Sequence, residues 1–350
     1  MKNKMKINDL FEIVYIKNQS NIKYKKELLN AFSRTTIDNS FITFTSLTNQ
    51  SYIIYTTKSN SINCFDFNKE KIMKSINNAH NSEILSFRYN CNKYKNKEYI
   101  VSVSIDKNIK LWEFPTFSLI VNIERAHRNS FIFSLCILPL KNSDFILSTS
   151  GSDLEKIRVW DFKGNKIMEI NDSNERTGFI DIYQSLDNNA SYIIIGNYGN
   201  IKSFIFESNE LYKVYCDNSE EKNDHTNFII YDKDKYNIIL IDSCFDGYIR
   251  LWDFHNTNLI KKIKCLNKPD AFLRNICLSE NKKYLFVVCD TENSIKIIDL
   301  QIYCVITCIK VNTKELLSIK NIKHNIYGNC FLSKGVLNDN IKLWTTYKLK

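Results

Sequence analysis

A short phrase of the form apolar, basic, apolar, Trp, acidic, Phe recurs along this chain and constrains its fold more than any other feature. Three close copies occupy residues 109–114, 157–162 and 249–254, and a fourth runs from Ile341 to Trp344. Degenerate copies, which lack the Trp, occupy residues 62–67, 201–206 and 295–300. The equivalent positions, 44 to 48 residues apart, are held by Phe65, Trp112, Trp160, Phe204, Trp252, Ile298 and Trp344. A repeat of this length indicates a series of similar structural units, each buried against its neighbours.

Each unit reads as four short strands separated by polar turns. In the unit that contains Trp112, strands are expected at 84–89, 99–104, 108–114 and 117–123. Leu111 and Trp112 are adjacent in the third strand and therefore point to opposite faces of the sheet. Both faces then need an apolar cover, which neighbouring units stacked in a ring would provide. We therefore predict an all-β fold, a β-propeller of four-stranded antiparallel blades.

The two ends of the chain are expected to share one blade. After Val311 the chain offers only three strands, at 315–320, 326–333 and 340–347, and one strand at 11–16 is left over before the first full unit. Pairing the N-terminal strand with the last blade would remove both exposed edges. This closure predicts a seven-bladed propeller.

The whole chain, 1–350, is therefore predicted to be one domain. Its expected parts are a closing strand of blade seven at 11–16, a loop at 17–38, blades one to six at 39–310, and the rest of blade seven at 311–350. Within the loop, residues 24–32 have helical composition. They predict either a surface helix packed over the closure or a partner-binding insertion.

The composition favours an intracellular protein, cytoplasmic or nuclear. No stretch reaches the roughly 18 apolar residues of a membrane-spanning helix, and the first residues are too charged for a signal peptide. The number of cysteines, 11, is odd, and several fall in apolar runs, where a free thiol behaves as a small hydrophobe. Because paired Cys-x-x-Cys is absent, the sequence predicts no metal site.

Four residue types recur around three of the tryptophans. A histidine precedes the first strand, a hydroxyl residue lies in the second, an aspartate lies in the turn before the third, and the tryptophan follows. The sets are His80, Ser102, Asp106 and Trp112 in blade two; His127, Thr149 or Ser150, Asp153 and Trp160 in blade three; and His225, Asp246 and Trp252 in blade five, where Asp242 or Ser243 stands in place of the hydroxyl.

In these residues the chain resembles the WD-repeat family of β-propellers. The resemblance implies that the four side chains form a hydrogen-bonded network inside each blade, which makes them structural rather than catalytic. It covers blades two, three and five, and the other four blades are identified by their period. It also implies a non-enzymatic scaffold or adaptor that mediates protein–protein interactions through the loop-bearing face, within a multiprotein complex.

The sequence offers no sign of an enzyme or of a cofactor site. With 8 glycines it contains no glycine-rich phosphate loop. Ser150-Gly151-Ser152 lies at a junction of strand and turn and lacks a nucleophile elbow. Repetition of the histidine and aspartate in several blades argues against a single active site. A propeller enzyme with an active site in the channel is the third hypothesis.

Residues at the entry to the first strands are candidates for contacts. An apolar residue recurs at the start of the first strand of most units. These residues are expected to pack between blades near the channel, or alternatively to form a stacking platform for RNA bases. They are Phe41, Ile84, Phe131, Phe179, Phe228 and Phe272. Their polar neighbours are expected to face the rim and to bind a partner protein. These are Glu83, Arg128, Arg176, Asn227 and Arg274.

The formal charge is +10, and it is concentrated at the two ends of the chain. Residues 1–26 and residues 318–350 each carry a net charge of +5, and the proposed closure would bring them together. If this basic patch is functional, it predicts an RNA-associated propeller as the alternative function. The other interpretation is that the two termini are solvated and have no role. The candidate residues of the patch are Lys23, Lys25, Lys26, Lys348 and Lys350.

Overall fold

The computed structural model describes most of the chain. The described residues are 12–14, 41–56, 60–127, 130–150, 156–170, 177–185, 190–197, 199–217, 225–234, 237–266, 273–290, 292–311, 316–325, 328–335 and 342–345. The predicted helix at 24–32 lies outside them, as do Lys23, Lys25, Lys26, Lys348 and Lys350 of the basic patch.

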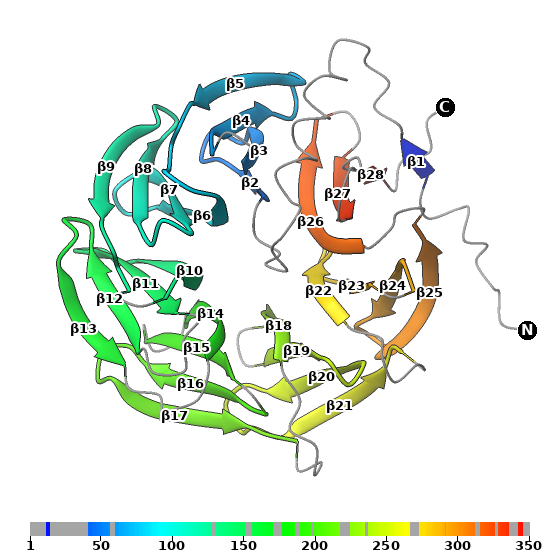
Figure 1. Cartoon of the computed structure of the whole chain (residues 1–350). Helices are drawn as coiled ribbons and strands as arrows, with labels where there is room; N and C mark the ends of the chain where they lie inside the picture. The colour runs from blue at the N-terminus through cyan, green and yellow to red at the C-terminus, as the bar shows by residue number, and fades with distance from the viewer. Residues whose placement is uncertain are drawn as a thin grey trace, which may run out of the picture.

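Six blades are each made of four consecutive antiparallel strands (Figure 1). The prediction of an all-β propeller with four-stranded antiparallel blades is confirmed. Blade one contains β2 (Phe41–Thr45), β3 (Ser51–Thr56), β4 (Ile62–Asp66) and β5 (Lys71–Ile76). Blade two contains β6 (Ile84–Asn92), β7 (Lys97–Ser104), β8 (Ile109–Phe114) and β9 (Ser118–Ile123). Blade three contains β10 (Ile132–Pro139), β11 (Asp144–Ser150), β12 (Ile157–Asp161) and β13 (Lys166–Ile170).

Blades four to six repeat this order. Blade four contains β14 (Thr177–Gln184), β15 (Ser191–Asn197), β16 (Ile201–Ile205) and β17 (Glu210–Tyr215). Blade five contains β18 (His225–Asp232), β19 (Ile238–Cys244), β20 (Tyr248–Asp253) and β21 (Leu259–Lys264). Blade six contains β22 (Leu273–Leu278), β23 (Tyr284–Cys289), β24 (Ser294–Asp299) and β25 (Cys304–Lys310).

One further four-stranded sheet, which we call the terminal sheet, combines strands from both ends of the described chain. Its strand order is β1-β28-β27-β26. The strands are β1 (Glu12–Val14), β26 (Leu316–His324), β27 (Gly328–Gly335) and β28 (Lys342–Thr345). β1 runs antiparallel to β28, with Glu12 opposite Thr345 and Val14 opposite Leu343. The strand is three residues long, shorter than the predicted 11–16.

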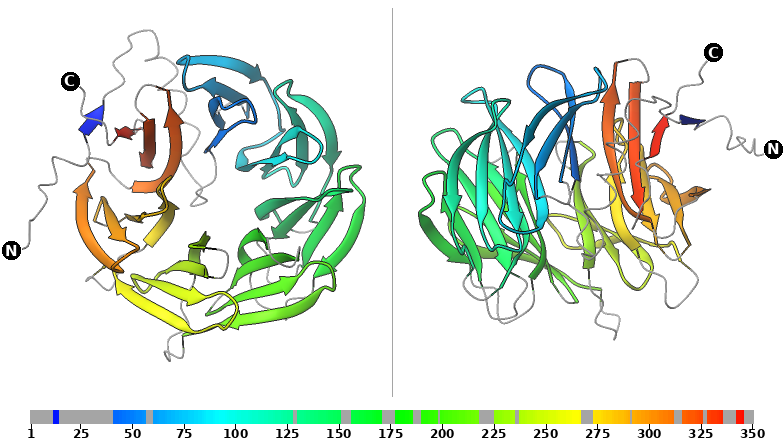
Figure 2. Two further views of the ribbon diagram at one scale, coloured as in Figure 1. Left: turned by 180° about the vertical axis from the view of Figure 1, so that it is seen from behind. Right: turned by 45° about the horizontal axis from the view of Figure 1, so that its top comes forward.

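The sheets stand around a common centre like the blades of a fan. β2, β6, β10, β14, β18, β22 and β26 are nearest the centre, and the fourth strands of blades one to six form the outer wall (Figures 1 and 2). In the outer strand β9, Leu119 and Ile120 are exposed.

Adjacent residues of the repeated phrase are buried on opposite sides of their blade. Leu111 packs in a cluster that includes Ile137 and Trp160 of blade three, whereas Trp112 packs with Ile54 of blade one. Both side chains are at most 5% exposed. The sequence-based expectation that each sheet is covered on both faces is confirmed in this blade.

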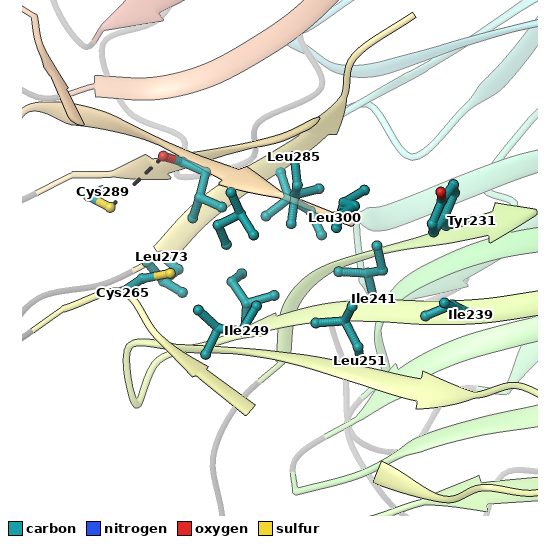
Figure 3. Packing of buried hydrophobic residues seen from close by; sticks show 14 of the residues in the cluster. Tyr231, Ile239, Ile241, Ile249, Leu251, Cys265, Leu273, Leu285, Cys289 and Leu300 are labelled. Carbon is teal, nitrogen blue, oxygen red and sulfur yellow. Dashed lines mark hydrogen bonds between the residues drawn. The ribbon is translucent and has the colours of Figure 1, made fainter. Parts of the chain in front are cut away.

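The interface between blades five and six has the same construction (Figure 3). Ile241 and Leu251 of blade five face Leu273, Leu285 and Leu300 of blade six, and all five are buried. Burial of aliphatic surface at about 25 cal/mol per Å² makes such interfaces the main source of stability in a ring of sheets. Within the described part of the chain there is no helical segment with the length and hydropathy needed to cross a bilayer.

Candidate functional site

The repeated polar residues of blade two meet in one chain of hydrogen bonds. The indole Nε1–H of Trp112 donates to Ser102 Oγ over 2.9 Å, and Ser102 Oγ lies 2.8 Å from His80 Nε2. On the other side of the ring, His80 Nδ1 lies 3.0 Å from Asp106 Oδ2. The side chains of His80 and Ser102 are buried. The network therefore satisfies polar atoms that would be costly to bury alone.

Asp106 also organises the turn that precedes β8. Its carboxylate accepts hydrogen bonds from the backbone N–H groups of Asn81 and Asn108. Burial opposes ionisation of Asp106, but these hydrogen bonds, together with the contact to His80, outweigh it and hold its pKa below the usual value. The carboxylate is thus ionised and structural, and these hydrogen bonds all join it to residues of blade two.

In blade three the hydroxyl of the network belongs to Ser148, and the predicted Thr149 or Ser150 is wrong. Trp160 Nε1–H donates to Ser148 Oγ over 3.0 Å, and the same oxygen lies 2.9 Å from His127 Nε2. Thr149 instead accepts a hydrogen bond from the backbone N–H of Ser134. The connection between β11 and β12 is two residues longer than that between β7 and β8, which moves the hydroxyl further from the tryptophan. The predicted Asp153 lies outside the described residues.

In blade five a carboxylate takes the place of the hydroxyl. Trp252 Nε1–H donates to Asp242 Oδ2 over 2.9 Å, which resolves the choice between Asp242 and Ser243. Asp246 accepts a hydrogen bond from the backbone N–H of Tyr248, as Asp106 does from that of Asn108. Its side-chain partner is the buried Arg250 rather than a histidine.

The place predicted for His225 is also wrong. It does not precede the first strand but begins β18, where it pairs with Cys244. In blade two that register position is held by Ile84, opposite Ser104. His225 is therefore a substitution inside the strand rather than the counterpart of His80.

The terminal sheet contains a partial network that the sequence did not reveal. Trp344 Nε1–H donates to Ser333 Oγ over 2.8 Å. In the register, Phe331 is opposite Trp344, and the two rings stack with centroids 5.7 Å apart. Counting back 11 residues from Trp344 could have found Ser333, since Ser102 lies 10 residues before Trp112.

A cavity of about 280 Å³ lies at the centre of the ring, lined by residues of six innermost strands. Its apolar lining includes Ile42, Phe228 and Ile276, and its charged lining comprises Arg88, Asp181 and Lys320. A second cavity of about 150 Å³ shares Arg88, Tyr89 and Asp181 with the first and extends along β10. We call these two cavities, which share charged lining residues, the channel site.

The channel site has an excess of positive charge. Desolvation by the surrounding protein raises the pKa of Asp181, while the positive charges of Arg88 and Lys320 oppose that rise. One Asp181 oxygen also accepts a hydrogen bond from the backbone N–H of Ile182 over 2.9 Å. Two cations therefore share the lining with a single carboxylate, which favours a ligand that brings negative charge.

The predicted contact residues lie in different surroundings. Asn227 lines the channel site and is half-buried. Glu83 is half-buried just before β6, and Arg274 forms an ion pair with Asp290, with Nε 2.7 Å from Oδ2. Arg128 and Arg176 lie outside the described residues. Among the described members of this set, Asn227 alone lines the channel site, and the charged lining residues Arg88, Asp181 and Lys320 were not predicted.

The apolar series at the strand entries is mostly enclosed. Phe41, Ile84 and Phe228 are buried, Phe179 is half-buried, and Phe131 is 39% exposed. Phe272 lies outside the described residues. A stacking platform needs rings with free faces, so the enclosed members favour packing between blades over base stacking.

Comparison with known proteins gives no relative. No model of a known protein family matches the chain, and no curated protein matches it. The assignment of a role therefore depends on the hydrogen-bonded networks and on the channel site.

Proposed function

We propose that this protein is a divergent WD-repeat propeller that acts as a non-catalytic scaffold and binds an acidic segment of another protein at the channel site. The family assignment is supported by the His80, Ser102, Asp106 and Trp112 network and by the shorter version of it in blade three. The β-propeller fold itself is common among protein-interaction scaffolds.

The channel site is the observation that carries the proposal. Its larger cavity, about 280 Å³, is just below the usual range of roughly 300–1,000 Å³ for pockets that enclose a small-molecule ligand. A cavity of this size suits one or two side chains of a bound segment. Ile42, Phe228 and Ile276 would contact the apolar part of such a side chain, and Arg88 and Lys320 would attract its carboxylate.

The test reverses the charge of the channel site. We expect the double variant Arg88→Glu, Lys320→Glu to bind its partner about tenfold more weakly or worse, because like charges would then face the acidic segment. Capture from the protein's own cells by proximity labelling, followed by quantitative mass spectrometry and cross-link mapping, measures the loss. Circular dichroism melting measures the stability of the wild type and the double variant. Equal melting temperatures exclude unfolding as the cause of the lost binding.

The matched control is Lys71→Glu, Lys74→Glu on the outer strand β5, where both lysines are exposed. It makes the same change in net charge and should keep every partner. Equal recovery by the channel variant and the control contradicts the proposal. Recovery of RNA without a stable protein partner would instead support the alternative function, and titration with generic RNA at low and then higher salt distinguishes the two.

We further propose that β1 completes a seventh blade and closes the ring. The proposal is supported by the register of Glu12, Ile13 and Val14 against β28, which would cover an otherwise open edge next to Trp344. Deleting residues 1–16 is expected to lower the melting temperature by several degrees, whereas deleting residues 1–10 should leave it nearly unchanged. Equal melting of both truncated proteins and the full chain would contradict closure by this strand.

A further inference from the structure

Three side chains of types that bind metals meet inside blade five. His225 begins β18, and Asp242 and Cys244 lie near the end of β19. Asp242 and Cys244 are two residues apart, so they share one face of the strand. His225 is directly opposite Cys244 in the antiparallel register and therefore shares that face as well. The side chains of all three are at most 6% exposed.

The same three positions hold one aliphatic and two hydroxyl side chains in blades two and three. In blade two they are Ile84, Ser102 and Ser104, and in blade three they are Ile132, Ser148 and Ser150. Blade five has an imidazole in place of the aliphatic side chain, a carboxylate in place of one hydroxyl and a thiol in place of the other. All three exchanges increase the capacity to bind a metal ion, although each places a more polar or more reactive group in the interior.

The nitrogen, sulfur and carboxylate oxygen donors lie close enough together to surround a small divalent ion, with one donor atom from each residue within 4.8 Å of the other two. His225 Nδ1 lies 3.2 Å from Cys244 Sγ and 3.4 Å from Asp242 Oδ2. Cys244 Sγ lies 3.7 Å from Asp242 Oδ1. For zinc, ligand bonds of about 2.0–2.3 Å at tetrahedral angles place neighbouring donor atoms about 3.3–3.6 Å apart. The nitrogen and sulfur donors are near this spacing, and the carboxylate would have to rotate so that one of its oxygens meets the same ion.

The charged groups that surround this cluster are paired with one another. Arg250 is bound by Asp246 and Asp217, and Lys262 lies 2.6 Å from Asp217. These two cations and two carboxylates neutralise each other. The buried carboxylate of Asp242 has His225 as its close neighbour, with Oδ2 3.4 Å from Nδ1, and a divalent cation could be bound between the two groups.

We propose that His225, Asp242 and Cys244 form a binding site for a divalent metal ion, with zinc as the preferred ion. Nitrogen, sulfur and carboxylate oxygen donors in tetrahedral arrangement suit zinc better than calcium or magnesium, which take oxygen ligands. The thiol of Cys244 gives up its proton when the ion binds, and water or another donor occupies the fourth position. The indole N–H of Trp252 donates a hydrogen bond to Asp242 Oδ2 and so fixes the orientation of this carboxylate.

Cobalt(II) provides the test, because it occupies zinc sites and reports thiolate coordination by a charge-transfer band in the near ultraviolet. The full chain, freed of metal by a chelator, is titrated with cobalt(II) and then with zinc. We expect about one equivalent of cobalt(II) to bind and to produce this band. Zinc should then displace the cobalt, and zinc binding should raise the melting temperature of the protein. Absence of the band in the wild-type protein would overturn the proposal without any need for a variant.

Two serine variants identify the ligand. Cys244→Ser is expected to weaken metal binding by about 100-fold and to abolish the charge-transfer band. The variant should fold, because serine occupies the same register position in blades two and three. The matched control is Cys289→Ser, since Cys289 has the equivalent position in blade six and is opposite Leu273 rather than a histidine. Equal metal binding by the two variants would contradict the assignment.

Discussion

Replacing Trp112 by alanine is expected to lower the free energy of unfolding by about 3–5 kcal/mol, the usual cost of removing a large buried aromatic side chain. Trp112 is 5% exposed and packs against Ile54 of blade one. Its removal would leave a cavity between two blades and deprive Ser102 of its indole donor. Equilibrium unfolding in guanidinium chloride measures the change.

Two further variants separate packing from hydrogen bonding. Trp112→Phe keeps most of the apolar volume but loses the N–H, and we expect a cost of about 1–2 kcal/mol. Leu119→Ala, opposite Trp112 in the sheet register but 47% exposed, should remain within about 0.5 kcal/mol of the wild type. A Trp112→Ala protein as stable as the Leu119→Ala protein would show that the tryptophan is not a structural anchor.

Arg250→Met is expected to destabilise the protein by about 3–5 kcal/mol, because it removes one partner from a buried ionic cluster. Arg250 is 2% exposed, and its guanidinium binds both Asp246 and Asp217. Methionine would fill much of the volume but would leave Asp246, whose side chain is 12% exposed, without its cation. Asp217 would keep only Lys262. Urea unfolding near neutral pH tests this expectation.

The pH dependence of the variant supplies a second measurement. Burial opposes ionisation of Asp217, but hydrogen bonds from Lys262 and Arg250 outweigh it and hold its pKa below the usual value. A depressed pKa stabilises the fold above the unfolded-state pKa of about 3.9, and this contribution is lost as the pH falls through the folded-state pKa. The wild type should therefore lose stability in acid, and the variant should lose less.

Arg158→Met is the matched control for this cluster. Arg158 is opposite Ser148 in blade three, as Arg250 is opposite Asp242 in blade five. Its partner Glu169 is 27% exposed, so their ion pair is partly hydrated, and we expect a cost of about 1 kcal/mol or less. Equal losses for the two arginine variants would contradict the special role of Arg250.

The local part of the fold could be predicted from the sequence because short-range pattern determines it. The third strand of blade two was expected at 108–114 and is observed at Ile109–Phe114. Adjacent apolar residues in that strand can only be buried if both faces of the sheet are covered, and Leu111 and Trp112 are buried in this way. Periodicity and alternation carry this information within a single unit.

The details of the networks depended on loop length and register, which the pattern does not show. Ser148 was missed because two extra residues between β11 and β12 moved it away from Trp160. His225 was assigned to the wrong place because a histidine near a strand start was read by analogy with His80. An error of a few residues changes which side chain enters a network.

The sequence pointed to Asn227 and Phe228 of the channel site but not to its charged residues. Arg88 and Asp181 come from blades two and four and Lys320 from the terminal sheet, and the arrangement of the sheets around one centre brings them to one cavity. The cluster in blade five was missed for a related reason. His225 and Cys244 are opposite each other across two strands, so no short spacing motif marks them.

The burial of Leu111 and Trp112 on opposite sides of one sheet has a consequence for how such a chain can change during evolution. Removing a blade would bring together two faces that never met before, so their side chains would have to fit by chance. Duplicating a blade raises the same difficulty at a new contact. Connecting loops and outer strands face no such demand, and new partners can be acquired there by substitution or insertion while the number of blades stays constant.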